Sequence, residues 1–145
     1  QSNFFSADVK EIIPPQLVSR MGLTLREMSD ACQLLLPKAQ VQAYHAHMSG
    51  LDLFRQHLRK NLKTAKSQLI VNFSRKSLAG TGMSSGHFSI VGAYNAEKRQ
   101  VLILEVNGDK ESFWLSEKAL FSAMIAIDPV SRIPRGWTVV KGNDK

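Results

Sequence analysis

Residues 86–106 read GHFSIVGAYNAEKRQVLILEV, and the hydrophobic pattern of this stretch indicates the class of the fold. Two runs in it, 88–94 and 101–106, are rich in the β-branched and aromatic residues that favour strands. The residues between the two runs, beginning with Asn95 and Ala96, are typical of a turn. The stretch therefore predicts a β-hairpin, which is a unit of an antiparallel sheet.

The predicted hairpin carries His87 and Glu105. If its loop has three or five residues, both side chains lie on the same face of the sheet, with Cβ atoms roughly 5–8 Å apart. A carboxylate at that distance can orient an imidazole, which gives the base half of a Cys-His-acid or Ser-His-acid site. The alternative is an ordinary cross-strand pair on a half-exposed face, which stabilises a sheet by only about 0.2–1 kcal/mol.

Two helices are predicted near the start of the chain. A pair of prolines introduces the first, over 16–21. Thr24 and Glu27 form a capping box for the second, which should end before Pro37. The spacing of the apolar residues in this second helix predicts that Cys32 points into a core.

Further helices and strands follow. A third helix opens around Ser49 and Asp52, and its apolar stripe consists of Leu51, Phe54, Leu58 and Leu62. Ser116 caps a last helix, with apolar residues in register at Leu120, Ala123, Met124 and Ile127. Other strands are expected over 39–44, 69–73 and 135–140. Helices first and strands later predict an α+β fold, in which N-terminal helices pack on a mainly antiparallel sheet.

The composition is that of one globular domain. With 145 residues, of which 43% are hydrophobic and 21% charged, the chain can bury a core of its own. We expect 1–145 to be a single domain with a mostly helical part (1–66) and a sheet-rich part (67–145). The single cysteine excludes disulfide frameworks and Cys-rich zinc modules. No apolar run reaches the 18 or so residues of a membrane helix, so no membrane span is expected.

The chain is basic, with a formal net charge of +7 at pH 7, which favours anionic partners. The densest basic stretch, 55–66, has the helical spacing of a solvated helix face, and a nucleic-acid-binding helix is the alternative interpretation. We expect no nucleic acid among the partners.

Gly86 and Arg75, which lie next to predicted strands, are two candidate binding residues. The glycine-rich loop 80–86 lacks a Gly-Lys-Ser/Thr sequence and precedes a strand, so it is not expected to bind phosphate. Gly86 would let a substrate approach the imidazole of His87, although a flexible surface loop explains the glycine equally well. Arg75 follows the strand at 69–73, where its guanidinium either holds a carboxylate bidentately or forms a charge at the rim.

The other histidines give weaker signals. His45 and His47 have the spacing of metal ligands, but the further ligands that a site requires are missing, so we predict no metal site. His57 falls on the charged side of its predicted helix and is expected to be solvated.

Taken together, these motifs resemble the phytochelatin synthase family. The strongest block is Gly86-His87-Phe88-Ser89, followed by Gly92-Ala93-Tyr94-Asn95 and Leu102-Ile103-Leu104-Glu105-Val106. Weaker matches are Ser2-Asn3-Phe4-Phe5, Asn72-Phe73-Ser74-Arg75-Lys76, Trp114 and Arg135-Gly136. The resemblance covers essentially the whole chain.

The resemblance implies a papain-like cysteine protease fold, of which this chain would be the C-terminal part. Members of the family take the γ-Glu-Cys unit of glutathione as an acyl-enzyme and pass it to another glutathione or to water. By resemblance, His87 is the general base and Glu105 stands at the acidic position of the triad. Asn72, Arg75 and Arg135 stand at positions that resemble the pocket for the γ-glutamylcysteinyl group.

Two departures from the family pattern affect these expectations. The family's nucleophile lies in an upstream Tyr-Cys-Gly segment that is not in this sequence, and a buried Cys32 is no substitute because burial disfavours a thiolate. Glu105 stands where the family usually has Asp, and its extra methylene moves the carboxylate. In addition, 107–112 replaces a basic and aromatic Arg-x-Lys-Tyr-Pro-Pro stretch, which favours hydrolysis of glutathione over phytochelatin synthesis.

The resemblance therefore implies a γ-glutamylcysteine dipeptidyl transferase or glutathione hydrolase in heavy-metal detoxification, with its Cys upstream of Gln1. The alternative is a catalytically dead relative that binds glutathione or a thiol peptide. We expect no tightly bound cofactor; a heavy-metal ion or metal-glutathione thiolate would be an activator or substrate. The expected partners are glutathione or another thiol peptide, the Cys-bearing upstream segment and a second copy in a homodimer. The cytoplasm is the favoured location, with export after removal of a leader as the alternative.

Overall fold

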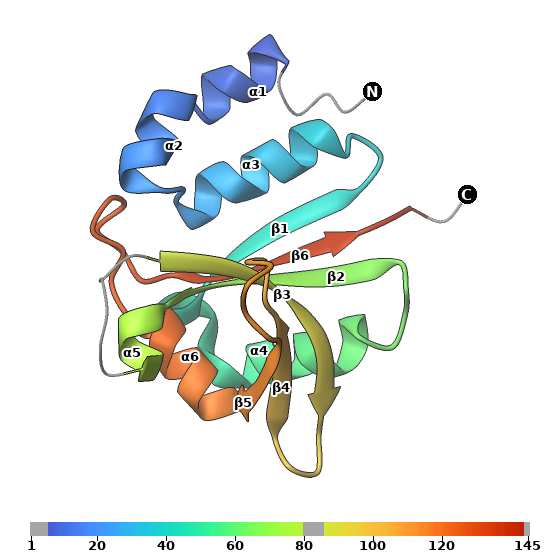
Figure 1. Ribbon diagram of the computed structural model, residues 1–145. Coiled ribbons are helices and arrows are strands. Elements are labelled where there is room, and N and C mark those ends of the chain that lie inside the picture. Colours follow the sequence, from blue (N-terminus) through green and yellow to red (C-terminus); the bar gives the residue numbers. More distant parts are fainter. Residues whose placement is uncertain (1–5, 80–85, 144–145) are drawn as a thin grey trace.

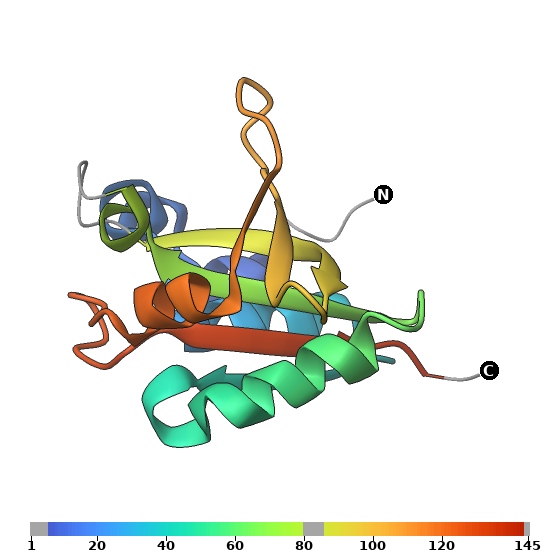
Figure 2. The same cartoon turned by 90° about the horizontal axis from the view of Figure 1, so that it is seen from below.

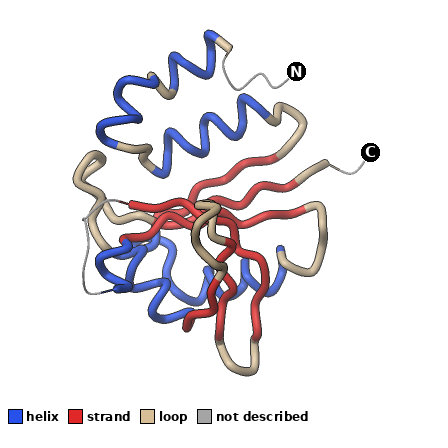
Figure 3. Tube along the Cα trace, viewed as in Figure 1, coloured by secondary structure: helices blue, strands red, loops and turns tan. Residues whose placement is uncertain are grey.

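The computed structural model describes residues 6–79 and 86–143 (Figure 1). The helices in these residues are α1 (Ala7–Ile12), α2 (Pro15–Met21), α3 (Leu25–Leu35), α4 (Ala46–Asn61), α5 (Arg75–Ala79) and α6 (Glu117–Ile125). The strands are β1 (Gln40–His45), β2 (Ser67–Ser74), β3 (Gly86–Asn95), β4 (Gln100–Leu104), β5 (Phe113–Ser116) and β6 (Gly136–Lys141). Figure 3 marks the helices and strands along the trace.

The six strands form one sheet in the order β1-β6-β2-β3-β4-β5. Every neighbouring pair in this order is antiparallel. The last strand of the chain therefore lies between the first two. The prediction of an α+β fold with an antiparallel sheet is confirmed.

Helices cover both faces of the sheet (Figures 1 and 2). On one face α3 packs on β1 and β6, and α1 packs on α3. On the other face α4 packs on β1, β2 and β6, while α6 packs on β2 and contacts both α4 and α5. The predicted packing of N-terminal helices on the sheet is confirmed.

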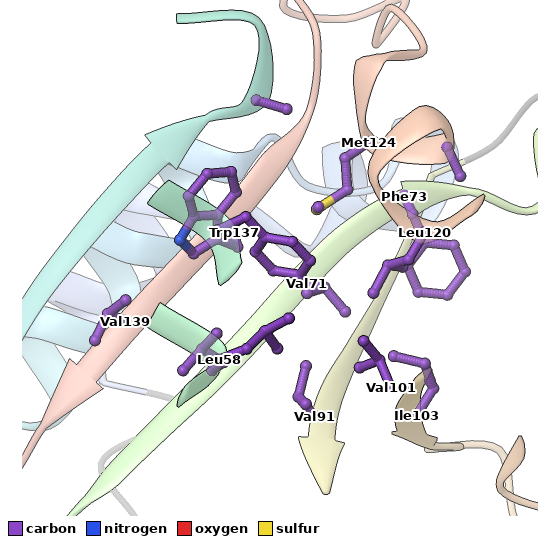
Figure 4. Close-up of a cluster of buried hydrophobic side chains, with 14 residues drawn as sticks. Leu58, Val71, Phe73, Val91, Val101, Ile103, Leu120, Met124, Trp137 and Val139 are labelled. Atoms are coloured by element: carbon purple, nitrogen blue, oxygen red, sulfur yellow. The ribbon is translucent and has the colours of Figure 1, made fainter. Parts of the chain in front are cut away.

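The main core lies between the sheet and the second of these helical layers (Figure 4). Phe54 and Leu58 of α4 are fully buried in it, together with Leu120 of α6 and Trp137 of β6. The stripe that the sequence predicted for α4 is thus confirmed. Burial of each such side chain contributes roughly 1.5–3 kcal/mol to stability.

The predicted helix caps are present. The backbone N–H of Glu27 donates to Thr24 Oγ1 at 3.2 Å, and the N–H of Thr24 donates to Glu27 Oε2 at 2.8 Å. At α6, the N–H of Ala119 donates to Ser116 Oγ at 3.1 Å. These bonds satisfy backbone donors that the first turn of a helix leaves unpaired.

The predicted position of Cys32 in a core is wrong. Cys32 is only half-buried, and the buried residues of α3 are Leu25, Ser29 and Ala31. Polar contacts hold Ser29 on the buried face of α3: its Oγ donates to the carbonyl of Leu25 at 2.9 Å and lies 2.7 Å from Thr138 Oγ1. Ser29, rather than Cys32, therefore faces β6.

Two helix ends also differ from the prediction. The helix expected to open around Ser49 and Asp52 is preceded by a turn of helix from Ala46, and the two parts are separated by a kink at Gly50, whose φ of 80° is not helical. The part after Gly50 begins where the sequence predicted. The last helix ends at Ile125, so Ile127 is not in its register; it is 64% exposed and forms an isolated bridge with Pro134. Pairing with Pro134 draws the chain away from the helix axis.

Candidate active site

The hairpin of β3 and β4 is confirmed, but its loop differs from the expected length. Asn95 pairs with Gln100, so the loop consists of the four residues 96–99. In a regular hairpin an even loop would place Glu105 on the face away from His87, because successive side chains alternate between faces. Loop length alone therefore does not bring the two residues together.

A β-bulge at Gly92 brings them to one face. The pairing shifts by one residue there, so Gly92 is an extra residue in β3 that has no partner in β4. The shift changes the partner of each later β4 position by one, and this moves Glu105 to the face of His87. A Cβ atom at Gly92 would lie 2.7 Å from Leu104 Cδ2, so glycine suits this bulge.

His87 and Glu105 are in direct contact. The distance from His87 Nε2 to Glu105 Oε1 is 2.9 Å, and their side chains are 13% and 5% exposed. The ring of Phe73, which pairs with His87 across β2 and β3, packs edge-on against the imidazole at 5.6 Å between ring centres. The pair is therefore held at the rim of the main core, largely out of water.

The backbone after β4 fixes the carboxylate of Glu105. Its Oε1 accepts hydrogen bonds from the N–H groups of Val106 at 2.9 Å and Asn107 at 3.3 Å. The N–H of Glu105 in turn donates to Ser112 Oγ at 3.2 Å. The segment that follows the strand thus wraps around the carboxylate and holds it towards His87.

Arg75 joins this pair from the start of α5. Its Nη2 lies 2.9 Å from His87 Nε2 and 3.4 Å from Glu105 Oε1. The Arg75 side chain is one-third exposed. The sequence had suggested that Arg75 holds a substrate carboxylate or forms a rim charge; in the structure its guanidinium contacts the histidine and the acid.

The electrostatics favour a neutral imidazole beside an ionised carboxylate. Burial, and then the charge of Arg75, lowers the pKa of His87, although Glu105 acts in the opposite direction. Burial alone would raise the pKa of Glu105, but the hydrogen bonds from Asn107, His87 and Val106 outweigh it, so this pKa is lowered. At neutral pH the imidazole is therefore able to accept a proton.

The other nitrogen of the imidazole is open. Among residues 6–79 and 86–143, His87 Nδ1 has no hydrogen-bond partner, since both contacts of the ring are made through Nε2. With its proton on Nε2, the imidazole donates to Glu105 and accepts no hydrogen bond from Arg75, which then acts on the ring through its charge. In this tautomer the imidazole can take a proton at Nδ1 and becomes an imidazolium stabilised by the acid. The geometry is that of a general base with its orienting acid.

The influence of Arg75 on His87 can be measured directly. Arg75→Gln is expected to raise the pKa of His87, because it removes the neighbouring positive charge that disfavours the imidazolium. A pH titration of the His87 imidazole by NMR reports this pKa. Lys76→Gln, at the exposed next position, is the matched control. An unchanged His87 pKa in Arg75→Gln, or an equal rise in the control, would contradict the assignment.

Asn72, Gly86 and Arg135 form a second group. A Cβ atom at Gly86 would lie 2.7 Å from Arg135 Nε and 3.1 Å from Asn72 Oδ1. Both side chains are buried, and within residues 6–79 and 86–143 Asn72 Oδ1 has no hydrogen-bond partner. Arg135 Nη1 donates to the carbonyls of Ala126 at 2.9 Å and Ile127 at 3.0 Å.

The two groups lie on opposite sides of the sheet end. His87 pairs with Phe73, whereas Gly86 pairs with Ser74 and Asn72 pairs with Phe88. Paired residues share a face and neighbours alternate, so Asn72 and Gly86 face away from the imidazole. The structure thus brings Arg75, but not Asn72 or Arg135, to the His87–Glu105 pair. The rest of the glycine-rich loop, 80–85, lies outside the described residues.

The prediction that His57 is solvated is wrong. Trp137 Nε1 donates to His57 Nδ1 at 2.9 Å, and the ring of Tyr44 packs edge-on against the imidazole at 4.6 Å between ring centres. Burial, then the charges of Lys141 and Lys60, lowers the pKa of His57. The helical pattern did not reveal this role, because the partner tryptophan is eighty positions away along the chain.

This histidine makes stability depend on pH. The folded pKa of His57 is below the ordinary value of about 6.5, so the unfolded chain binds the proton more strongly. His57 should therefore cost stability as the pH falls below about 6.5. Urea unfolding at about pH 7.5 and 5.5 should show a larger loss for the wild type than for His57→Gln, which does not titrate. Equal losses in both proteins would contradict this role.

Two findings on the described residues bear on other classes of site. Across 6–79 and 86–143, no group of three or more His, Cys, Asp or Glu side chains is arranged to hold a metal ion. No helix in the same residues is long and apolar enough to cross a membrane.

Comparison with known proteins assigns the family. The family model described as Phytochelatin synthase matches residues 1–137. The chain belongs to the phytochelatin synthase family. Glutathione gamma-glutamylcysteinyltransferase 3 of Lotus japonicus is 31% identical over 128 residues, which cover 88% of this chain and 26% of the relative. Glutathione gamma-glutamylcysteinyltransferase 2 of Arabidopsis thaliana is also 31% identical, over 88% of this chain and 27% of the relative.

A third relative is similar over a shorter stretch. The glutathione gamma-glutamylcysteinyltransferase of Schizosaccharomyces pombe is 32% identical over 93 residues, which cover 63% of this chain and 22% of the relative. The chain thus spans about a quarter of the length of the phytochelatin synthase relatives that it matches.

Proposed function

We propose that this chain forms the base-and-acid half of a papain-like cysteine site that cleaves glutathione to γ-Glu-Cys and glycine. The observation that carries the proposal is the 2.9 Å contact between His87 Nε2 and Glu105 Oε1 with His87 Nδ1 left open. A segment upstream of Gln1 would supply the nucleophilic cysteine. The names of the relatives support glutathione as the substrate class.

The proposed reaction has two stages. First, Nδ1 of His87 takes the proton of the cysteine thiol, and the thiolate attacks the carbonyl carbon of the Cys–Gly peptide bond. The imidazolium then gives its proton to the leaving amine, so glycine departs and a thioester remains. In the second stage His87 activates water or the amine of another glutathione, which displaces the cysteine. Glu105 stabilises the imidazolium in both stages.

Cys32 is not suited to the nucleophilic role. It lies on α3, which packs on β1 and β6, and its thiol contacts Met28 Sδ at 4.0 Å. Burial raises the pKa of Cys32, so the reactive thiolate is disfavoured. These observations support an origin of the nucleophile outside this chain.

Three side chains are proposed to hold the substrate: Arg75 beside His87, and Asn72 and Arg135 on the opposite face of the sheet end. Among the described residues, Asn72 Oδ1 is a buried acceptor without a partner, which suits an N–H of the γ-glutamylcysteinyl group. Arg75 is one-third exposed and has five N–H donors, so it can bind a substrate carboxylate while it contacts the His87–Glu105 pair. Arg135 would act from behind Gly86, where the absence of a side chain leaves room for the guanidinium.

The acceptor in the second stage is proposed to be water. In this chain Asn107 and Ser112 hydrogen-bond Glu105, so the segment 107–112 serves to position the acid. It contains one basic residue, two acidic residues and no aromatic residue in place of the family's basic and aromatic stretch, which argues against efficient use of a second glutathione. A heavy-metal ion would enter this scheme within a metal-glutathione thiolate, as part of a substrate.

A catalytically dead relative that binds glutathione is the second candidate. The unpartnered Asn72 Oδ1 supports binding independently of turnover, because it would gain a hydrogen bond from a ligand without any reaction. This candidate predicts a complex of glutathione with the chain but no release of glycine.

The test uses the full-length parent protein with glutathione, with glycine and γ-Glu-Cys quantified by mass spectrometry. Release of both products, together with a transient mass increase on the enzyme equal to the γ-Glu-Cys acyl group, is the expected result. If calorimetry shows that glutathione binds but no glycine is released, the protein is the catalytically dead, glutathione-binding relative and not the enzyme. Neither binding nor release would overturn both.

A further inference from the structure

Two histidines, His45 and His47, lie at the junction between β1 and α4. His45 is the last residue of β1, Ala46 begins α4, and His47 follows one position later. The ring centres of His45 and His47 are 6.1 Å apart, with 61° between the ring planes. Neither residue takes part in the site described above.

His45 is held in place by the segment before β6. Its Nδ1 lies 2.9 Å from the carbonyl oxygen of Pro134, and the N–H of Ala46 donates to the carbonyl of Arg135 at 2.9 Å. Gly136 pairs with His45, and a Cβ atom there would overlap the carbonyl oxygen of Tyr44. The backbone around His45 is therefore closely packed and fixed.

The bond to Pro134 also fixes the tautomer of His45. A carbonyl oxygen can only accept a hydrogen bond, so His45 Nδ1 must carry the proton. In the neutral ring, Nε2 is then left with its lone pair available. Metal-binding histidines are commonly oriented in this way, by a hydrogen bond from the other ring nitrogen to a carbonyl or carboxylate.

The second ring is accessible and correctly spaced. The His47 residue is exposed, so its rotamer can adjust without disturbing the core. With nitrogen–metal distances of about 2.0–2.1 Å, two imidazoles on one ion have ring centres roughly 5–6 Å apart. The observed 6.1 Å is close to this range, and rotation of the exposed His47 ring can bring one of its nitrogens to the ion.

We propose that His45 and His47 form a two-imidazole site for a divalent transition-metal ion such as Cu²⁺, Ni²⁺ or Zn²⁺. Imidazole is a preferred ligand of these ions. Since the described residues offer no group of three or more ligating side chains, water completes the coordination and the ion exchanges readily. The site goes beyond the proposed function and does not depend on it.

The test titrates the chain, purified without a histidine tag, with CuCl2, NiCl2 and ZnCl2 by isothermal calorimetry. One ion per chain is expected for at least one of the three metals. His47→Ala should weaken the affinity at least tenfold, because it removes one of two protein ligands. Gln56→Ala, at an exposed position of α4, is the control and should bind as the wild type does.

NMR locates the ion independently of any variant. A substoichiometric amount of Cu²⁺ should broaden the imidazole signals of His45 and His47 more strongly than those of His57. His45→Ala loses the hydrogen bond to Pro134, so its fold must first be checked by circular dichroism. If His45→Ala does not fold, the test rests on His47→Ala, which changes only an exposed side chain. No binding up to millimolar metal, affinity unchanged in His47→Ala, or broadening confined to other residues would overturn the proposal.

Discussion

Replacement of His87 by alanine in the full-length parent is expected to reduce glycine release from glutathione by at least about a thousandfold. The substitution removes the group that takes the proton from the cysteine thiol and returns it to the leaving amine. Because His87 lies at the rim of the core, the remaining side chains should still pack. Initial rates of glycine release measure the effect, and circular dichroism confirms the fold.

The control for this prediction is Lys98→Ala, an exposed position in the loop of the same hairpin. It should retain the wild-type rate. A double variant, His87→Ala with Glu105→Gln, sharpens the test. If the acid acts only through the histidine, the double variant should be no slower than His87→Ala alone, because residues that act as a unit are not additive. A folded His87→Ala protein that releases glycine as fast as Lys98→Ala would refute the role of the imidazole.

Gly136→Ala is expected to lower the free energy of unfolding by about 3 kcal/mol or more. The added methyl group would overlap the carbonyl oxygen of Tyr44 and lie 3.0 Å from the N of Ala46. These are backbone atoms, which cannot move aside as a flexible side chain can, so β1 and β6 would have to separate. Urea denaturation measures the loss, as a lower midpoint with a similar slope.

Gly108→Ala is the matched control for this second prediction. No heavy atom of the described residues lies within 4 Å of the position of its Cβ, and Gly108 is exposed. Alanine there should leave the stability unchanged within about 0.5 kcal/mol. Equal stabilities of the Gly136 and Gly108 variants would show that the seam between β1 and β6 relaxes freely, contrary to the close packing described here.

Local patterns predicted the elements well where the signal was itself local. The capping box of Thr24 and Glu27, the cap at Ser116 and the stripe through Phe54 and Leu58 involve residues within one or two helical turns. The hairpin of β3 and β4 was also predictable, since β-type runs and turn residues lie next to one another. Short elements with weak patterns, α1, α5 and β5, were not predicted.

The predictions failed where a distant partner decided the environment of a residue. Cys32 and Ser29 share one helix, but a hydroxyl on β6 determines which of them packs against the sheet. His57 has the helical position of a solvated residue, yet Trp137 buries it. Periodicity within a helix carries no information on such a partner.

The sequence by itself determined the residue types of the candidate site and their place on two adjacent strands, because a hairpin connects them through a short loop. Only the tertiary structure decided that His87 and Glu105 meet. The loop has an even number of residues, and the extra residue at Gly92 restores the common face. Arg75 reaches the pair because α5 follows β2 beside β3, a neighbourhood set by strand order. Strand pairing and bulges depend on contacts across the sheet, which no run of adjacent residues specifies.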